Sequence, residues 1–413
     1  MHADSWPETR IGDIGEVFTG RTPPTERQSY FGGEFPFITP TDMHQGKFAR
    51  STQRTISNEG AELLKRIQIP PNSICVSCIG WQMGEVIMTD RPSFTNQQIN
   101  TIVPNEKIDP SFLFYSLLPR KSELLSLGAA TGVRTPILNK SAFCDIKVKI
   151  PVLPLQRRIA GILSAYDDLI ENNQRRIKIL EEMARSLYRE WFVHFRFPGH
   201  EKGKMVPSPL GPIPQGWEVK RVPECVDINP RIIVPRDGEK PFVPMGCLSN
   251  DSMLISDIES RDGNSGAKFQ NGDTLFARIT PCLENGKTGF VQFLLDEQAV
   301  AYGSTEFFVL RSRTLTPEIV YLLARSDEFR GVAIKSMTGA TGRQRVQEQC
   351  FNDFHIAQPP RGLLDRFSAI VRSSFRLTYS LHLKIQNLRR TRDLLLPRLI
   401  SGQIDIKPLE SVA

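Results

Sequence analysis

Two cysteines, Cys75 and Cys78, have the spacing of a zinc or redox motif. A structural zinc site requires four ligands, and the sequence offers no second pair at a suitable distance. The segment around Cys75 also resembles a later segment, in which we align Phe276 with Cys75. A position that accepts phenylalanine is a packing position. The cysteine pair is therefore expected to be structural, and we predict no metal and no other cofactor.

The segment from Gly286 to Thr288, with Lys287 between them, ends like a phosphate-binding loop. That motif also requires a glycine five residues before Gly286, where this chain has Pro281. Proline removes one of the backbone amides that would hold a phosphate. We therefore reject nucleotide binding and expect Lys287 on a loop, free to contact a DNA phosphate.

Catalytic constellations are not found in the sequence. An amino-methyltransferase would carry an Asp/Asn-Pro-Pro-Tyr/Phe motif and a glycine-rich cofactor loop. The closest string, Asn229-Pro230-Arg231, lacks the second proline and the aromatic residue and is typical of a turn. The six histidines are isolated from one another, and none pairs with a plausible nucleophile. The sequence thus predicts no catalytic residue.

The most informative pattern is a long-range repeat. The segment Phe143-Cys144-Asp145-Ile146 recurs as Phe351-Asn352-Asp353-Phe354. A Thr-Gly-(x)-Arg loop, at Thr131 to Arg134 and again at Thr341 to Arg343, precedes each copy. The two copies lie 208 residues apart, from Phe143 to Phe351. A period of this length indicates a duplicated domain rather than a solenoid. The glycine of the loop allows close approach to a phosphate, and its arginine is a bidentate donor.

The charge balance favours an acidic partner. The 413 residues carry a net charge of +7, which points most simply to nucleic acid. Phosphates would be met by Lys, Arg and backbone amides, and base edges by Arg, Asn, Gln, Ser and Thr on loops. The candidate DNA-binding residues are Arg21, Lys47, Arg50, Arg54, Gln82, Arg91, Thr131, Arg134, Arg231, Arg236, Lys240, Arg278, Lys287, Thr341, Arg343 and Arg345.

These candidates lie in two segments of mixed structure. In the first, Phe35–Ile38 and residues 99–103 read as strands, and a helix is expected after Pro110. A long helix is predicted next. Its apolar residues recur alternately four and three positions apart, which is typical of the seam of a coiled coil. That seam comprises Ile159, Leu163, Tyr166, Ile170, Asn173, Ile177, Leu180, Ala184, Leu187 and Trp191.

A second helix repeats the spacing at Phe367, Val371, Ser374, Thr378, Leu381, Ile385 and Leu388. An exposed apolar stripe of this length is unfavourable, so we expect the two helices to pair within the chain as an antiparallel coiled coil and rigid spacer. The alternative is that each helix packs only on its own domain. The predicted fold is mixed α/β with a pseudo-twofold repeat and these parts: residues 1–152, first globular domain; 153–197, first long helix; 198–216, Pro/Gly linker; 217–360, second globular domain; 361–405, second long helix.

Composition also bears on the cellular compartment. The seven cysteines are scattered and odd in number, which favours a reducing environment over a disulfide framework. The sequence shows neither a signal-peptide pattern nor an apolar run long enough for a membrane helix. A cytoplasmic location and no membrane partner are expected.

At this point the layout resembles the specificity subunits of type I restriction-modification systems. The segment from Pro151 to Ala160 resembles the family's proline-rich entry to its first conserved helix. The opening Trp6 with Thr19-Gly20-Arg21, and the closing Leu396-Pro397-Arg398, resemble the family's usual start and end. The resemblance spans essentially the whole chain.

The resemblance implies a non-catalytic subunit with two target-recognition domains, each reading half of an interrupted site on double-stranded DNA. It also implies that the helices dock two modification subunits, which bring S-adenosylmethionine and methylate adenine, and it allows two restriction subunits in the complex. Because the two domains differ in sequence, the half-sites should differ, with centres on the order of 10 base pairs apart. The alternatives are a coiled-coil structural protein and a DNA-modifying enzyme with an unrecognised site.

Overall fold

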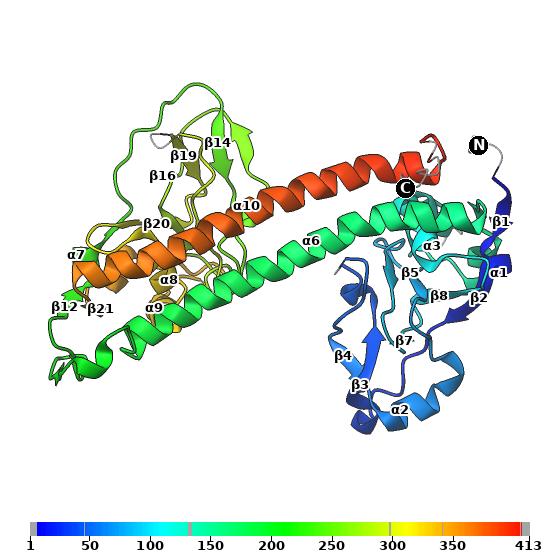
Figure 1. Cartoon of the computed structure of the whole chain (residues 1–413), viewed down its shortest axis with the longest axis horizontal. Helices are drawn as coiled ribbons and strands as arrows, with labels where there is room; N and C mark the ends of the chain where they lie inside the picture. Colours follow the sequence, from blue (N-terminus) through cyan, green and yellow to red (C-terminus); the bar gives the residue numbers. More distant parts are fainter. Residues whose placement is uncertain are drawn as a thin grey trace, which may run out of the picture. The chain divides into compact units, whose positions relative to one another are not determined.

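The computed structural model describes residues 6–44, 46–130, 134–296, 299–340, 342–404 and 406. They belong to two compact units: the first unit combines residues 1–171 with 386–413, and the second unit is the continuous segment 172–385. Figure 1 labels many of the elements of both. Within the described residues, no helix has the length and apolar character needed to cross a membrane. The candidates Thr131 and Thr341 lie outside the described residues.

The first unit contains a four-stranded antiparallel sheet, a three-stranded sheet and one strand pair. The four-stranded sheet has the order β2 (Gly15–Thr19), β8 (Ile99–Pro104), β5 (Ile74–Ser77), β6 (Val86–Met88). The three-stranded sheet has the order β4 (Arg54–Ile56), β3 (Phe31–Ile38), β7 (Phe94–Thr95), with β3 and β7 parallel. The remaining elements are the pair β1 (Glu8–Arg10) and β9 (Lys147–Lys149), and the helices α1 (Ile11–Ile14), α2 (Asn58–Leu63), α3 (Pro110–Leu117), α4 (Lys121–Ala129) and α5 (Lys140–Asp145).

The strands predicted at Phe35–Ile38 and at 99–103, and the helix predicted after Pro110, are confirmed. Local chemistry explains where α3 begins. The carboxylate of Asp109 accepts a hydrogen bond from the Phe112 amide at 2.9 Å, and Pro110 occupies the first turn, where its missing amide is not needed. The helix then buries Phe112, Leu113 and neighbouring residues in the core.

The second unit repeats this topology. Its antiparallel sheet has the order β13 (Val226–Ile228), β20 (Phe307–Ser312), β17 (Thr274–Ala277), β18 (Thr288–Phe290). Its second sheet has the order β15 (Glu259–Arg261), β14 (Lys240–Val243), β19 (Val300–Gly303), β16 (Ala267–Gln270), and β14 and β19 are parallel as β3 and β7 are. The other elements are the pair β12 (Glu218–Arg221) and β21 (His355–Gln358), the hairpin β10 (Met205–Val206) and β11 (Ile213–Pro214), and the helices α7 (Val222–Cys225), α8 (Pro317–Ala324) and α9 (Asp327–Lys335).

The strand register corrects one detail of the sequence alignment. The amide of Cys78 donates to the Gln98 carbonyl at 2.7 Å, and the amide of Arg278 donates to the Glu306 carbonyl at 3.0 Å. Arg278 therefore corresponds to Cys78, and Cys75 corresponds to Leu275 rather than to Phe276. Because every residue of β5 and β17 is buried, these strands have no inside-outside alternation to fix a register from sequence.

The two long helices are α6 (Leu153–Tyr188), which continues as a π-helical turn over Arg189–Val193, and α10 (Arg361–Ile400) (Figure 1). In the first unit, Leu163 of α6 shares a core with Leu396 and Leu399 of α10. In the second unit, Ala184 and Trp191 of α6 share a core with the beginning of α10, at Leu364, Phe367, Val371 and Phe375. Early residues of one helix thus meet late residues of the other, which confirms the antiparallel pairing.

Most of the predicted seam is buried. Ile159, Leu163, Ile170, Ile177, Ala184 and Trp191 of α6 are buried, as are Phe367, Val371, Thr378, Leu381 and Ile385 of α10. Asn173, the polar member, is 4 % exposed, and its Nδ2 has no hydrogen-bond partner among the described residues.

Each globular part is held to its helices by polar contacts as well as by its core. In the first unit, Asp167 of α6 accepts hydrogen bonds from the Tyr115 hydroxyl and from Arg392 of α10, each at 2.5 Å. In the second unit, the Glu181 carboxylate accepts from the Ser252 hydroxyl at 2.6 Å and from the Met253 amide at 2.8 Å. These contacts position the loops of each globular part against the helix pair.

Candidate nucleic-acid interface

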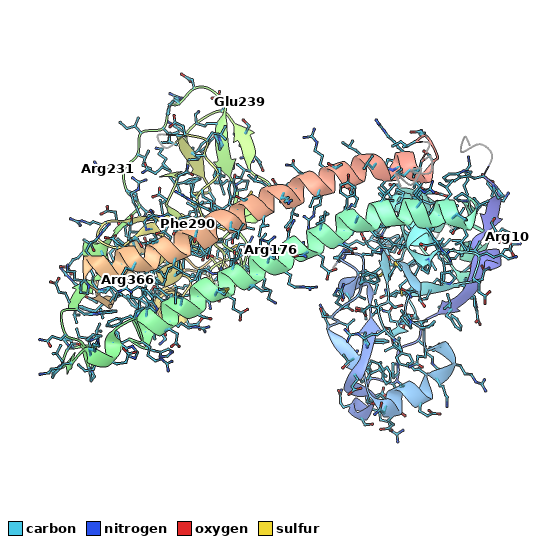
Figure 2. The ribbon with its side chains drawn as sticks, in the orientation of Figure 1. Arg10, Arg176, Arg231, Glu239, Phe290 and Arg366 are labelled. Carbon is cyan, nitrogen blue, oxygen red and sulfur yellow. The ribbon has the colours of Figure 1, made fainter. Side chains whose placement is uncertain are left out.

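The second unit has a cleft of about 800 Å³ at the ends of several strands. We call it the arginine cleft, and it is lined by Asn229, Pro230, Arg231, Ile232, Ile233, Gly266, Ala267, Lys268, Arg278, Thr305, Phe307 and Val309. Arg231 is exposed on the segment that leaves β13, and Figure 2 shows it on the outer side of this unit. The cleft therefore brings together two predicted arginines, Arg231 and Arg278, and adds Lys268, which the sequence analysis missed.

Arg278 and Arg345 share one carboxylate beside this cleft. Arg345 donates from Nε and Nη2 to Glu306 at 2.7 to 3.0 Å, and Arg278 Nε lies 3.6 Å from the same carboxylate. The hydrogen-bonded carboxylate raises the pKa of Arg345. Backbone contacts bring the three residues together. Ile279, next to Arg278, forms an isolated β-bridge with Arg345, and the Arg278 amide donates to the Glu306 carbonyl. We call Arg278, Glu306 and Arg345 the arginine triad.

The first unit carries amide side chains at the turn that corresponds to the turn of Glu306. The turn Asn96–Gln98 stands where the second unit has the turn that contains Glu306. The Thr22 hydroxyl bonds to the Gln97 side chain at 2.8 Å, and the Asn96 and Gln98 side chains bond to each other at 3.0 Å. We call this turn, with the adjoining segment Gly20–Thr22, the amide edge.

An exposed tryptophan adjoins the amide edge. Trp81 is 67 % exposed in the turn that follows β5, next to the predicted candidate Gln82, which is also exposed. The Gly80 amide of this turn bonds to the Pro136 carbonyl at 2.9 Å, which brings the segment from Arg134 to Pro136 to the same edge. The sequence analysis missed Trp81, although a tryptophan next to a turn glycine is a detectable signal. Aromatic residues at such edges are common in binding surfaces.

Three predicted lysines do not face solvent in the way that the sequence suggested. Lys47 is half-buried, and its ammonium donates to the hydroxyls of Ser111 and Ser164 at 3.0 and 2.7 Å. Burial lowers the pKa of Lys47. These contacts tie Lys47 to α3 and α6, so we leave it out of the proposed interface.

Lys287 and Lys240 are also half-buried and bonded to backbone. Lys287 donates to the Met245 carbonyl at 3.0 Å, which corrects the expectation of a free loop lysine. Lys240 donates to the carbonyls of Gly238 and Gly263, the latter at 3.0 Å. Sequence alone did not reveal these bonds, because all three acceptors are backbone carbonyls.

Two predicted arginines of the first unit are directed at other parts of the protein. Arg50 bonds to Glu171 of α6 at 2.7 Å and lies 3.6 Å from Asp90. Arg91 donates to the Arg50 carbonyl at 2.6 Å. Arg50 thus stabilises the contact between the globular part and α6, and Arg91 bonds to the backbone of Arg50. Both contacts compete with a role of these arginines in binding DNA.

The remaining candidates are exposed. The Arg54 guanidinium lies 3.9 Å from the centre of the Phe31 ring, on the sheet that contains β4. The Arg21 amide bonds to the Thr95 carbonyl at 2.9 Å, which places this residue at the amide edge. Arg343 follows Gly342, whose φ of +81° is the left-handed conformation that the predicted glycine loop requires. The exposed candidates without an ion pair or a tie to another part of the protein described above are Arg21, Arg54, Gln82, Arg134, Arg231, Arg236 and Arg343.

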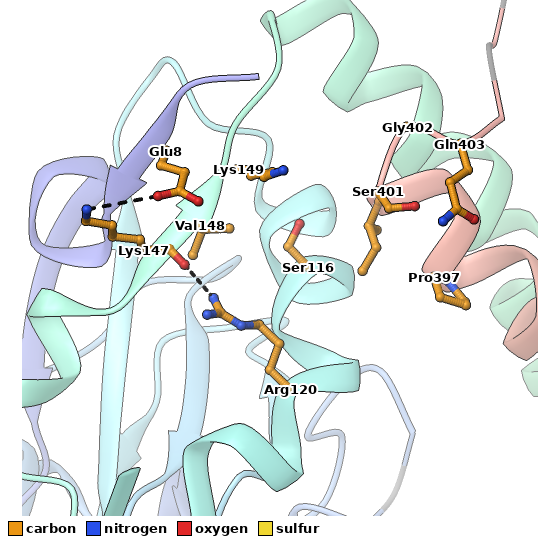
Figure 3. A pocket seen from close by; sticks show the side chains of 11 residues that line it. Glu8, Ser116, Arg120, Lys147, Val148, Lys149, Pro397, Ser401, Gly402 and Gln403 are labelled. Atoms are coloured by element: carbon orange, nitrogen blue, oxygen red, sulfur yellow. Dashed lines mark hydrogen bonds and ion pairs between the residues drawn. The ribbon is translucent and has the colours of Figure 1, made fainter. Parts of the chain in front are cut away.

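A cavity of about 620 Å³ in the first unit also has a basic lining, but its cations have partners (Figure 3). Arg120 donates to the Lys147 carbonyl at 2.8 Å and forms an ion pair with Glu123. The Lys147 ammonium lies 4.0 Å from Glu8. Because these charges are compensated within the chain, we do not count this cavity in the interface.

The cysteine pair behaves as packing residues. Cys75 and Cys78 are buried, and burial raises the pKa of each thiol to about 12. A thiol with so high a pKa is a poor nucleophile and a poor metal ligand. In the part of the chain that the structure describes, His, Cys, Asp and Glu form no cluster suited to a metal ion.

Comparison with known proteins identifies a known domain. Residues 3–182 match the model of the type I restriction modification DNA specificity domain. The chain is 25 % identical to the MjaIX specificity subunit of Methanocaldococcus jannaschii, over 98 % of this chain and 94 % of that protein. Residues 3–182 thus carry a type I restriction modification DNA specificity domain, and the chain is similar to a specificity subunit along nearly its whole length. A second relative, the HindI specificity subunit of Haemophilus influenzae, is 35 % identical over 41 % of this chain and 38 % of its own length.

A solved structure has the same fold as this chain. The crystal structure of the type I restriction-modification S subunit from M. genitalium aligns with a TM-score of 0.60 at 13 % identity. The alignment covers 98 % of this chain and 97 % of that one, so both units and both long helices fall within it. The fold inferred from sequence is thereby confirmed.

Proposed function

We propose that this chain is the DNA-recognition subunit of a type I restriction-modification complex, and that it leaves methyl transfer and any cleavage to partner subunits. Each unit would read one half of an interrupted site, through the amide edge and Trp81 in the first unit and the arginine cleft in the second. One observation carries this proposal: the same fold occurs twice and presents chemically different side chains at the same edge.

That difference supports an asymmetric site. Identical units would favour a palindrome, whereas an amide-lined edge and an arginine-lined cleft offer different donors and acceptors to the bases. We propose two dissimilar half-sites with unread bases between them and centres on the order of 10 base pairs apart.

The helices offer surfaces for the partners. Ile179 and Met183 stand one turn apart on α6 and are exposed, Met183 by 61 %. Ile370 and Leu377 are exposed two turns apart on α10 of the same unit. Exposed apolar side chains at helical spacing are typical of a contact surface. We propose that the helices dock two methyltransferase subunits, which supply S-adenosylmethionine, and that restriction subunits join through these partners.

Co-expression tests this function. The chain would be produced together with the products of its neighbouring genes and purified in high salt, and the DNA of the producing cells would be examined for methylated adenine. We expect two methyltransferase subunits for each chain and methylation of one asymmetric, interrupted motif. A homodimer that leaves the DNA unmethylated would contradict the proposal and favour a structural protein.

A matched pair of variants locates the docking surface. Met183→Glu places a charge on the exposed apolar surface and should reduce recovery of the methyltransferase. Lys178→Glu places the same charge on a neighbouring, already polar position of α6 and should leave recovery unchanged. Equal recovery of the methyltransferase with both variants would show that it does not dock at this surface.

A further inference from the structure

The arginine triad is absent from the sister unit although the fold around it is the same. The positions of Arg278 and Glu306 are occupied by Cys78 and Gln98, as the paired hydrogen bonds between strand end and turn show. Arg345, which bridges Ile279, corresponds to Ile137, which bridges Ile79. The first unit folds without any of these charges, so the fold does not require them.

The geometry leaves one edge of Arg345 available. Its Nε and Nη2 are the atoms bonded to Glu306, so the edge formed by Nη1 and the second hydrogen of Nη2 remains for another acceptor. Arg278 lines the cleft, and its buried Nε has no hydrogen-bond partner among the described residues. A carboxylate that takes one edge of a guanidinium fixes the direction in which the other edge points.

The presence of Glu306 also restricts what that acceptor can be. Glu306 is about 20 % exposed on its side chain and stands between two arginines. Glu306 neutralises one of the two arginine charges and so weakens their attraction for a phosphate. The major-groove edge of guanine is neutral and presents two acceptors, O6 and N7, at the spacing of a guanidinium fork.

We infer that Arg278 and Arg345, oriented by Glu306, read guanine in the half-site of the second unit. This inference rests on the proposed function and adds the base that the second unit selects. Arg231 and Lys268, which have no such carboxylate in the cleft lining, would meet the phosphates on either side. Glu306 is a positioning residue, because it acts through the arginines.

The test compares motifs methylated by the purified complex on unmethylated genomic DNA. The variants are Arg345→Lys, which keeps the charge but cannot form a fork, and Glu306→Gln, which keeps the shape but frees the guanidinium. Arg221→Lys is the control, because Arg221 is an exposed arginine of the same unit that pairs with Glu224 outside the cleft. Thermal melting of each variant would verify that the fold is retained.

We expect the wild-type motif to contain guanine in one half. Arg345→Lys and Glu306→Gln should each reduce the selectivity for guanine at that position by roughly 5- to 150-fold. Selectivity in the other half of the motif should not change. A motif that neither variant alters would overturn the inference. A uniform loss of methylation at all sites would do the same, since it would mark Arg345 as a phosphate contact. Absence of methylation by the wild-type complex would instead overturn the proposed function and, with it, the inference.

Discussion

At the scale of single residues, the structure separates arginines that face outward from cations that hold the fold together. Arg134 and Arg343 are exposed beside the repeated glycine loops, whereas the ammonium of Lys47 lies between two serine hydroxyls. All three looked alike in sequence as basic residues in turn-rich segments. Only the outward-facing group is expected to contribute to the salt dependence of DNA binding.

Arg134→Ala and Arg343→Ala should each weaken DNA binding and reduce the slope of log affinity against log salt by about 0.9, the value for one released phosphate contact. Lys47→Met should leave that slope unchanged. Titration of the complex with a fluorescent duplex at several salt concentrations measures it. A Lys47→Met slope that falls as far as that of Arg134→Ala would place Lys47 at the DNA after all.

Glu181 provides a pH-dependent prediction. Burial raises the pKa of this carboxyl, which is 6 % exposed, although Ser252 and Met253 donate hydrogen bonds to it. The folded protein therefore holds this proton more tightly than the unfolded chain does. The stability linked to Glu181 is full at low pH and falls as the pH rises from about 4.3 through the raised pKa.

Glu181→Gln removes this titration and keeps an oxygen acceptor for Ser252 and Met253. The melting temperature of the variant, relative to wild type, should increase between about pH 4 and pH 7. Glu182→Gln, at the exposed neighbouring position, serves as the control for the loss of a surface carboxylate. A difference for Glu181→Gln that does not change with pH, or that only matches the control, would contradict this prediction.

At the scale of elements, spacing predicted the helices better than it predicted the strands. A four-three pattern over many turns has one register that buries it, so Leu163, Ile170 and Ile177 are buried as expected. Strand β5 is buried on both faces, and its run of apolar residues fits the sister strand equally well when shifted by one. That ambiguity explains the misalignment of Cys75 with Phe276.

The one polar seam residue has a measurable consequence. A buried amide without a partner costs on the order of 1–3 kcal/mol. Asn173→Leu, which has similar volume and no polar atoms, should therefore raise the free energy of unfolding by about 1 kcal/mol, as measured in a denaturant titration. Asn172→Leu is the matched control, because Asn172 is exposed on the same helix. A loss of stability in Asn173→Leu would indicate that its amide makes a necessary contact.

At the scale of the whole molecule, the duplication and the helix pair could be read from sequence, but most of the interface could not. The repeat located Arg134 and Arg343, and the positive charge directed attention to arginine. The role of Glu306 depends on a turn and a loop that lie far apart in the chain, Glu306 and Arg345, and meet only when folded. Trp81 was missed because the search considered charged and polar residues, whereas its signal is a tryptophan next to a turn glycine.

The two units also differ in how the chain completes them. The core of the second unit comes from residues within 172–385, whereas the core of the first unit needs Leu396 and Leu399 from the end of α10. A chain that stops after Ile385 should keep the second unit protected in hydrogen exchange and lose protection in the first. A chain that stops after Ile406 should protect both. Equal protection in the shorter chain would show that the first unit is self-sufficient.

This closure by the last part of the chain affects the order of events during synthesis. The first globular part leaves the ribosome early, yet the apolar side of α6 that Leu396 and Leu399 cover stays open until translation is nearly finished. The half that is made first is thus finished last. During that interval Leu163 and its neighbours form an exposed apolar surface that is prone to aggregation. A chaperone or partner subunit that covers this surface would therefore increase the yield of soluble full-length protein.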